Sequence, residues 1–258
     1  MTGAPRPHLS VVVPAYHEAR RLPASLAAMF THFGRCTLPH EVLIVVEHGT
    51  DGTLELAMEA AAKQANFRVI DSGPQRGKGH AVRSGMRQAQ GDLVFYMDAD
   101  LSVPLEEVDR FLAYFENHPE VDVLVGNRQH ALSRIEPRQT PVRQMMGQIF
   151  NRILRSLAPL DLRDTQCGFK AFRREAAEAI FARQRLDGFA FDVEVLLLAQ
   201  SLGHRIADLP VRWINSPESK VHIIRDSARM LWDTLRLRRL VARSENAARL
   251  AKRDLSKI

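Results

Sequence analysis

Cysteines and long apolar runs are scarce in this sequence. Its 258 residues include only two cysteines, Cys36 and Cys167, which lie far apart and lack the spacing of a metal site. This pattern excludes a disulfide-rich scaffold and favours a reducing, cytosolic environment. Residues 1–8 have no apolar signal core, and no run approaches the roughly 20 apolar residues that span a bilayer. We therefore expect no membrane-spanning helix of the chain's own.

Positive charge is concentrated near the end of the chain. The net charge is +6, and residues 225–258 carry ten Lys or Arg against four Asp or Glu, whereas residues 1–224 carry 26 of each sign. A basic segment on a neutral body indicates an anionic partner surface, either a membrane or a nucleic acid. No aromatic platform or nucleic-acid motif accompanies the basic segment, so we expect no nucleic-acid partner.

The basic segment also has apolar residues at helical spacing. They are Ile224, Ala228, Leu231, Trp232 and Leu235. We expect an amphipathic helix over 223–258 that lies peripherally on the cytoplasmic face of a membrane, next to a globular domain over 1–222. Ordinary core packing of Trp232 is the alternative.

Short β-branched runs alternate with helical patterns through the first half of the chain. The expected strands are 9–14, 41–46, 67–70, 93–97 and 121–125. The expected helices are 19–33, 53–64, 79–89 and 104–117. This alternation predicts an α/β fold with a mostly parallel, Rossmann-like sheet and helices on both faces. Ligands of such sheets bind beyond the carboxyl ends of the strands.

The second half is less regular. We expect a long helix over 140–157, an edge strand over 168–172, a helix over 190–202 and a strand over 206–213. No internal repeat or low-complexity linker separates these elements from the first half.

Two carboxylates follow the fourth expected strand, in Asp98-Ala99-Asp100. Acids at i and i+2 where a strand ends can point to one side of a cleft, and their hard oxygens suit Mg²⁺ or Mn²⁺ bound to a diphosphate. A solvated turn is the alternative. The strand before Asp98 favours the metal and nucleotide interpretation.

Two further polar segments follow strands. In Pro14-Ala15-Tyr16-His17-Glu18, Tyr16 can stack on a base and Glu18 can accept a hydrogen bond from a base or ribose. A plain helix start is an equal alternative for this segment. In the segment 76–80, RGKGH, the glycines allow close backbone approach and Lys78 can meet phosphate. A basic glycine-rich turn is the alternative there.

Taken in chain order, the segments 14–18, 76–79 and 98–100 resemble family 2 glycosyltransferases. In the second half, the segments 164–170 (DTQCGFK), 190–194 (AFDVE) and 219–220 (SK) closely resemble dolichyl-phosphate β-glucosyltransferases, which are similar in plan to polyprenyl-phosphate mannose synthases. The resemblance covers residues 10–240 and implies a GT-A fold, a nucleotide-sugar donor, a divalent metal, a lipid phosphate acceptor and inversion at the anomeric carbon. UDP-glucose is the favoured donor, with GDP-mannose as the other candidate.

The resemblance also implies roles for individual residues. Asp98 and Asp100 would bind Mg²⁺ or Mn²⁺, with Asp98 also on the nucleotide. The nucleotide-sugar contacts would come from Pro14, Ala15, Tyr16, Glu18, Glu47, Lys78, Asp98, Ala99 and Arg128. Arg143 would meet the acceptor phosphate, and Lys220 would close over the diphosphate. These two would act with Asp100 in catalysis.

The sequence departs from the family pattern after the second strand. The family has two acids there, whereas this chain has Glu47-His48, and Ser102 stands where mannose synthases have an amide. An acceptor phosphate, already anionic, needs no strong base. If the acceptor is a sugar hydroxyl, Asp192 or Glu194 is the candidate base, with a buried salt bridge as the alternative for Glu194.

Other hypotheses stay open at this point. The chain can be a glycosyltransferase for a soluble or glycan acceptor, or a non-catalytic nucleotide-sugar binding protein, which only the altered Glu47-His48 segment supports. Cys167 has no visible base partner, so we expect a packed residue and not a nucleophile. We expect His48 and His80 to be surface or hydrogen-bonded histidines.

Overall fold

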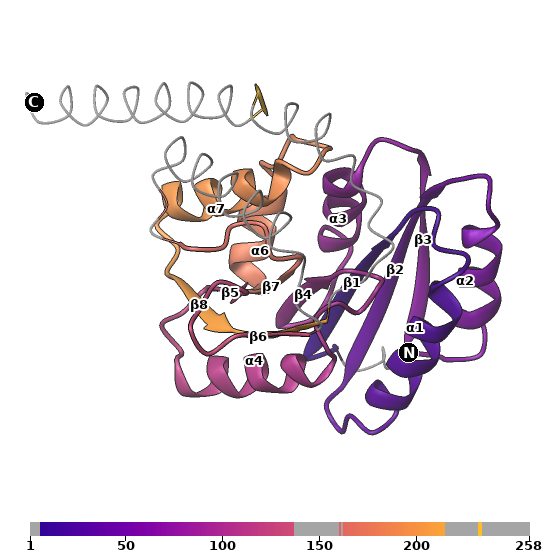
Figure 1. The fold of residues 1–258 in the computed structure, drawn as a ribbon, viewed down its shortest axis with the longest axis horizontal. Helices are drawn as coiled ribbons and strands as arrows, with labels where there is room; N and C mark the ends of the chain where they lie inside the picture. Colours follow the sequence, from indigo (N-terminus) through magenta and orange to yellow (C-terminus); the bar gives the residue numbers. More distant parts are fainter. Residues whose placement is uncertain (1–5, 137–159, 161, 215–231, 234–258) are drawn as a thin grey trace, which may run out of the picture.

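The computed structural model describes residues 6–136, 160, 162–214 and 232–233. In this part of the chain, seven strands form one sheet in the order β3-β2-β1-β4-β7-β5-β8 (Figure 1). These strands are β1 (Leu9–Ala15), β2 (His40–His48), β3 (Phe67–Pro74), β4 (Leu93–Met97), β5 (Val123–Asn127), β7 (Phe169–Arg173) and β8 (Ile206–Pro210). A small second sheet pairs β6 (Arg134–Glu136) with β9 (Arg212–Ile214) in parallel.

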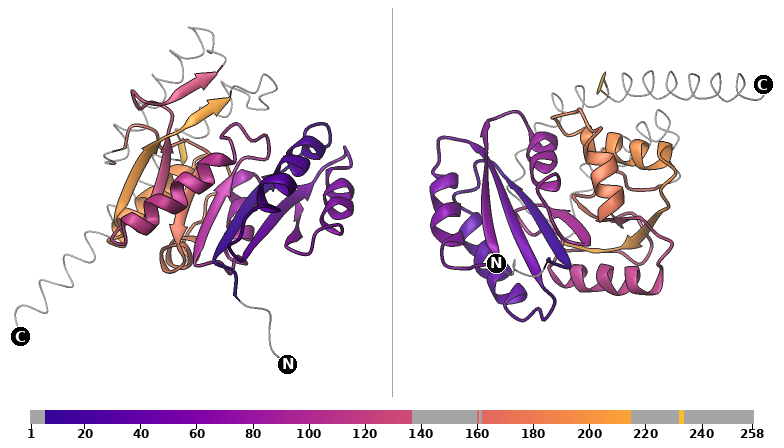
Figure 2. Two further views of the ribbon diagram at one scale, coloured as in Figure 1. Left: turned by 90° about the horizontal axis from the view of Figure 1, so that it is seen from below. Right: turned by 180° about the vertical axis from the view of Figure 1, so that it is seen from behind.

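The described helices cover both faces of the large sheet (Figures 1 and 2). They are α1 (Leu22–Phe33), α2 (Thr53–Ala61), α3 (Lys78–Met86), α4 (Glu106–Asn117), α6 (Arg174–Phe181) and α7 (Phe191–Ser201). Alternate residues of β1 pack into different cores: Val11 and Val13 join the core under α1, α2 and α4, and Val12 joins the core under α3, α6 and α7. A strand covered on both faces needs an almost continuous apolar run, which the sequence of β1 provides.

The strand order reverses beside β1, and this reversal places the candidate site. β1 pairs in parallel with β2 on one side and with β4 on the other. The chain leaves β1 and β2 to form α1 and α2 on one face, whereas it leaves β3 to form α3 on the other. The loops after β1 and β4 therefore lie beside this reversal at the carboxyl edge, where ligands of such sheets bind.

The mostly parallel sheet is confirmed, but one strand differs from its prediction. The run 168–172 is not an edge strand: β7 lies between β4 and β5 and is antiparallel to both. Both of its faces are buried, with Phe169 in one core and Phe172 in the other. Lys170 lies in the middle of this run, yet its side chain is fully buried and forms an ion pair with Asp192.

The expected strand 206–213 is also divided. β8 ends at Pro210, and the chain continues as β9 beside β6. Sequence reasoning did not anticipate β6 or α6, although α6 buries Ala176, Ala177, Ile180 and Phe181 at helical spacing. The first helix begins at Leu22 rather than 19, because Pro23 lacks an amide proton and fits the first helical turn.

The predicted helix 140–157, the boundary at 222 and most of the basic tail lie outside the described residues. Within the basic segment the structure describes residues 232–233, and Trp232 is 64% exposed there. Within the residues that the structure describes, no helix is long and apolar enough to cross a membrane.

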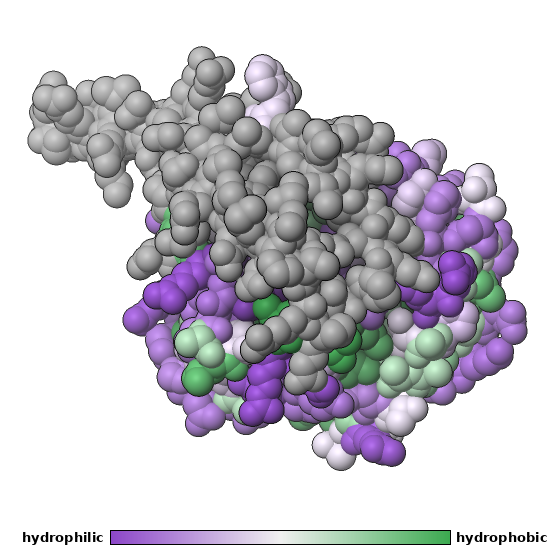
Figure 3. All heavy atoms as spheres, in the orientation of Figure 1, coloured by the Kyte–Doolittle hydropathy of each residue, from purple (hydrophilic) through white to green (hydrophobic). Residues whose placement is uncertain are grey.

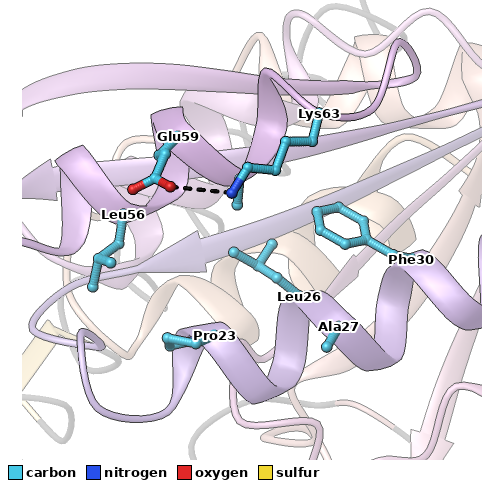
Figure 4. A pocket seen from close by; sticks show the side chains of 8 residues that line it. Pro23, Leu26, Ala27, Phe30, Leu56, Glu59 and Lys63 are labelled. Atoms are coloured by element: carbon cyan, nitrogen blue, oxygen red, sulfur yellow. Dashed lines mark hydrogen bonds and ion pairs between the residues drawn. The ribbon is translucent and has the colours of Figure 1, made fainter.

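Polar and apolar side chains alternate over the described surface seen in Figure 3. An open apolar groove of about 200 Å³ lies between α1 and α2, with the Glu59–Lys63 ion pair (3.1 Å) at its rim (Figure 4). Pro23, Leu26, Phe30 and Leu56 line it, and it contains none of the predicted site residues.

Candidate active site

The two aspartates after β4 stand beside two cationic side chains. The Lys78 Nζ lies 2.5 Å from the Asp98 Oδ1, and the Arg21 Nη1 lies 3.5 Å from the Asp100 Oδ2. The backbone N–H of Ser102 donates to the other Asp100 oxygen at 3.0 Å. The site therefore combines two carboxylates with two fixed positive charges at the carboxyl edge of the sheet.

Lys78 is held in its charged form. Burial alone would lower the pKa of Lys78, but the negative charges of Asp98 and Asp192 outweigh this effect and raise it. Lys78 is also the first residue of α3, so its ammonium lies at the end of the helix that attracts anions. This arrangement suits the binding of a diphosphate.

Arg21 is a site residue that the sequence analysis missed. Its Nε and Nη2 donate to the two oxygens of Glu18 at 2.8 and 2.6 Å, while its Nη1 faces Asp100. Arg21 thus joins the segment after β1 to the aspartates after β4. The available signal was the i, i+3 spacing of Glu18 and Arg21 at a helix start.

Glu47 holds the glycine-rich turn before α3. Only 2% of its surface is exposed, and its carboxylate accepts the backbone N–H groups of Arg76 and Gly77 at 3.1 and 3.0 Å. The His80 Nδ1 lies 3.1 Å from the same carboxylate. A glycine is required at 77, because φ is +132° and a Cβ would lie 2.5 Å from the Asp187 carbonyl oxygen.

Asp187 closes the same turn from the other side. It accepts from Arg76 at 2.8 Å and from Arg83 at 2.7 Å. Burial raises the pKa of Asp187, but the hydrogen bonds and charges of these two arginines prevail and lower it. The segment that carries Lys78 is therefore clamped between β2 and the chain before α7.

The second acidic position of the family is filled by a residue with its own partner. The His48 Nε2 lies 2.7 Å from the Asp71 Oδ1, and half of the His48 side chain is exposed. His48 and His80 are thus hydrogen-bonded histidines, as the sequence analysis expected.

Arg128 lies at the end of β5 and is paired with a buried acid. Its Nε and Nη2 donate to Asp164 at 2.7 and 2.9 Å, and its backbone N–H donates to the same carboxylate at 3.0 Å. Burial raises the pKa of Asp164, but the adjacent guanidinium outweighs burial and lowers it. The guanidinium carbon also stands 5.9 Å from the centre of the Trp213 ring. The contact of Arg128 with a donor stays a prediction.

The segment 164–170 brings the second half of the chain against Asp98. A Cβ on Gly168 would lie 2.6 Å from the Asp98 Cγ and closer still to one carboxylate oxygen. Cys167 is fully buried, and this burial raises the pKa of its thiol to about 12. Cys167 is therefore a packed residue, as predicted, and not a nucleophile.

A buried polar network lies behind this segment. The Asp192 Oδ1 accepts from the Tyr96 hydroxyl at 2.6 Å and from the Lys170 ammonium at 2.5 Å, and the Lys170 Nζ also donates to the Cys167 carbonyl at 2.7 Å. Asp192 is 4% exposed. This position suits a residue that supports the site better than a base that collects a proton from an acceptor.

Among the described residues, Glu194 has no salt-bridge partner of the kind that its alternative interpretation expected. Its carboxylate instead accepts the backbone N–H groups of Arg185 and Leu186 at 2.9 and 2.8 Å. Burial raises the pKa of Glu194. Glu194 therefore fixes the chain that leads to Asp187, and Asp192 rather than Glu194 lies on the side of the aspartates.

The remaining predicted residues divide into three groups. Pro14 and Ala15 end β1, and Ala99 is buried between the two aspartates. The Tyr16 ring stacks on the His17 ring, with centroids 4.2 Å apart and planes 11° apart. Arg143 and Lys220 lie outside the described residues.

Solved structures share this fold. Glucosyl-3-phosphoglycerate synthase from Mycobacterium tuberculosis, in complex with UDP, matches with a TM-score of 0.66 at 16% identity, over 90% of this chain and 80% of that one. Staphylococcus aureus TarS 1-349, in complex with UDP-GlcNAc, matches with a TM-score of 0.58 at 19% identity, over 90% of this chain and 66% of that one. The expected GT-A type fold is confirmed.

Sequence relatives are closer. A dolichyl-phosphate beta-glucosyltransferase of Dictyostelium discoideum is 31% identical over 90% of this chain and 74% of its own length. The mouse protein of the same name is 32% identical over 84% of this chain and 71% of its own length. A third relative of this kind, from Trichomonas vaginalis, is 30% identical over 84% of this chain, which spans 66% of that protein. The sequence profile "Glycosyl transferase family 2" matches residues 10–181, and the chain belongs to this family.

Proposed function

We propose that this protein is an inverting glycosyltransferase that moves glucose from UDP-glucose to a polyprenyl phosphate such as dolichyl phosphate. The observation that carries the proposal is the 2.5 Å contact between Lys78 and Asp98, which joins the glycine-rich turn to the aspartate pair. A lysine suited to a diphosphate and two carboxylates suited to a metal thus lie together at one edge of the sheet. The names of the relatives support glucose and dolichyl phosphate as donor sugar and acceptor.

Asp98 and Asp100 suit a divalent metal. Both follow one strand end, and their side chains are 38% and 20% exposed, so a cation can reach them. Among the described residues no three His, Cys, Asp or Glu side chains form a metal cluster, so diphosphate oxygens would complete the coordination. Bound Mg²⁺ or Mn²⁺ supplies Lewis-acid stabilisation of the leaving diphosphate. The solved glucosyl-3-phosphoglycerate synthase complex with Mn²⁺ and UDP-glucose supports this choice.

The chemistry is an in-line displacement. An oxygen of the acceptor phosphate forms a bond to the anomeric carbon, the bond from that carbon to the diphosphate breaks, and its electron pair leaves with the diphosphate. The nucleophile is already anionic, so no base has to remove a proton. Lys78 adds fixed positive charge next to the leaving group. Arg143 for the acceptor phosphate and Lys220 over the diphosphate remain parts of the proposal.

The geometry favours this function over transfer to a sugar hydroxyl. A hydroxyl acceptor would need a general base, and the candidate Asp192 is buried with one oxygen already bound by Tyr96 and Lys170. The basic segment 225–258 is proposed to hold the enzyme peripherally at the membrane that contains its acceptor.

The test is transfer of labelled glucose into an organic-extractable product. Purified protein is incubated with labelled UDP-glucose, Mn²⁺ or Mg²⁺ and a polyprenyl phosphate. Asp100→Ala should abolish transfer, and Asp109→Ala, on the exposed face of α4, should not change it. Label that stays in the aqueous phase, with wild type and every donor including GDP-mannose, would contradict the proposal.

A further inference from the structure

In the part of the chain that the structure describes, two polar side-chain atoms of the segment 164–170 have no hydrogen-bond partner. Thr165 is 2% exposed, yet within the described chain its Oγ1 is unpaired, and so is the buried Nε2 of its neighbour Gln166. Native proteins pair nearly all of their buried polar groups, because an unpaired one loses its hydration without compensation. Two such atoms on consecutive residues indicate that something outside the fold pairs with them.

Over the described ranges, only Arg174 and Gln184 also have unpaired buried side-chain atoms. Arg174 sits beside Asp92, at the amino end of β4, and forms ion pairs there. Gln184 donates through its amide to the carbonyl oxygens of Gly79 and Leu186, which leaves only its Oε1 unpaired. Thr165 and Gln166 are thus the unpaired polar atoms in the segment that reaches the aspartates.

The segment that carries them is fixed at both ends. Asp164 is bound by Arg128, and Lys170 is bound by Asp192 and by the Cys167 carbonyl. Between these anchors, Gly168 lies against the Asp98 carboxylate. Thr165 and Gln166 therefore belong to a fixed segment whose Gly168 contacts Asp98, so a ligand would bind them without a large ordering cost.

The two groups are neutral. Thr165 offers a hydroxyl that donates and accepts, and Gln166 offers two amide protons. The two cations that hold this segment, Arg128 and Lys170, are each paired with an aspartate. Phosphate recognition uses positive charge, as at Lys78, whereas neutral donors and acceptors match the hydroxyl groups of a sugar.

We propose that Thr165 and Gln166 form a subsite that hydrogen-bonds hydroxyl groups of the hexose carried by the nucleotide. This inference rests on the proposed function, and it adds the residues that recognise the transferred sugar. A site built to pair with a substrate hydroxyl discriminates against a donor that lacks it, because the protein groups are then left unpaired. The subsite therefore contributes to the choice of sugar, whereas Lys78 and the aspartates bind what every nucleotide sugar shares.

The first test needs no ligand. Thr165→Val keeps the shape of the side chain and removes the unpaired hydroxyl, so its Tm should equal or exceed that of the wild type. Thr165→Ser keeps the hydroxyl and serves as the paired variant. A clear fall in Tm for Thr165→Val but not for Thr165→Ser would show that the hydroxyl bonds within the fold, and would overturn the inference.

The second test separates the sugar from the nucleotide. Titration calorimetry with Mn²⁺ compares UDP-glucose with UDP for the wild type, Thr165→Val, Thr165→Ser and Gln166→Leu. Thr165→Val and Gln166→Leu should each weaken UDP-glucose about tenfold, with UDP affected less than twofold. Thr31→Val on α1, where the hydroxyl bonds only to the Ala27 carbonyl, is the matched control and should change neither affinity.

Each outcome decides the inference. Equal weakening of UDP and UDP-glucose, or no weakening of either, would overturn it. If Thr165→Val and Gln166→Leu selectively lose UDP-glucose binding but the wild type transfers no sugar to lipid, the subsite would be supported and the lipid acceptor contradicted. If the wild type transfers sugar to lipid but both variants bind UDP-glucose normally, the proposed function would be supported and the subsite contradicted. A wild type that binds UDP-glucose no more tightly than UDP, and that transfers no sugar from UDP-glucose or GDP-mannose to lipid, would contradict both proposals.

Discussion

A single methyl group at position 168 should separate stability from activity. In Gly168→Ala the new Cβ would lie 2.6 Å from the Asp98 Cγ, whereas ordinary van der Waals contact begins at 3.4 Å. The carboxylate must therefore move by about 1 Å, and its 2.5 Å contact with Lys78 must stretch. A misplacement of about 1 Å at a reacting centre costs on the order of 100-fold in rate.

The fold itself should tolerate this change. The obstructing atoms belong to the end of a side chain that is 38% exposed, so the carboxylate can rotate away without disturbing the cores. We expect kcat/KM for glucose transfer to fall about 100-fold, with Tm nearly unchanged. Gly188→Ala is the matched control, because a Cβ there meets nothing within 4 Å. Near-wild-type activity in Gly168→Ala would refute the placement of this segment against Asp98.

Three further predictions concern buried charges and the buried thiol. Lys170→Met should destabilise the protein by about 3–5 kcal/mol in urea unfolding, because it leaves a buried carboxylate without its cation; a loss under 1 kcal/mol would contradict the buried pair. The folded-state pKa of Asp164 is lowered from its ordinary 3.8, so its stabilising effect is present above that value and is lost as the pH falls through the folded pKa. Asp164→Asn should therefore unfold with less dependence on pH below about 4 than the wild type, and equal slopes would count against the pairing with Arg128. Cys167, with a thiol pKa of about 12, should react with a thiol reagent at pH 8 only after unfolding, and rapid labelling of both cysteines in the folded protein would exclude its burial.

The first half of the fold was readable from sequence because its signals are local. Each parallel strand is a short apolar run followed by a helical pattern, and the polar residues at its end lie at the ligand-binding edge by the rule of parallel sheets. The structure places Asp98, Asp100 and Lys78 at this edge, and their roles in binding and catalysis stay predictions. The central position of β7 was not predicted, because strand order depends on pairing between segments that are distant in the sequence. A short run that contains a lysine is also typical of an edge strand.

The supporting residues were the hardest to foresee. Glu47 looks like a ligand-binding acid in the sequence, yet its carboxylate accepts backbone N–H groups of a turn about 30 residues away. Arg21 and Asp187 belong to no sequence motif. Their ion pairs form only because segments that are distant in the sequence come together in the fold. The partners of a charged side chain are set by tertiary structure, which neither spacing nor composition encodes.

The direction of β7, which is antiparallel to both of its neighbours, has a wider consequence. Because β7 runs opposite to β4, it starts where β4 ends, so the chain just before β7 is delivered to the same edge as the aspartates. Most of the residues proposed to bind the nucleotide lie in the first hundred residues, whereas the loop entering β7 comes from a later part of the sequence. Under both proposals, substitutions in that loop would change which sugar is accepted and leave the residues proposed for the nucleotide unchanged.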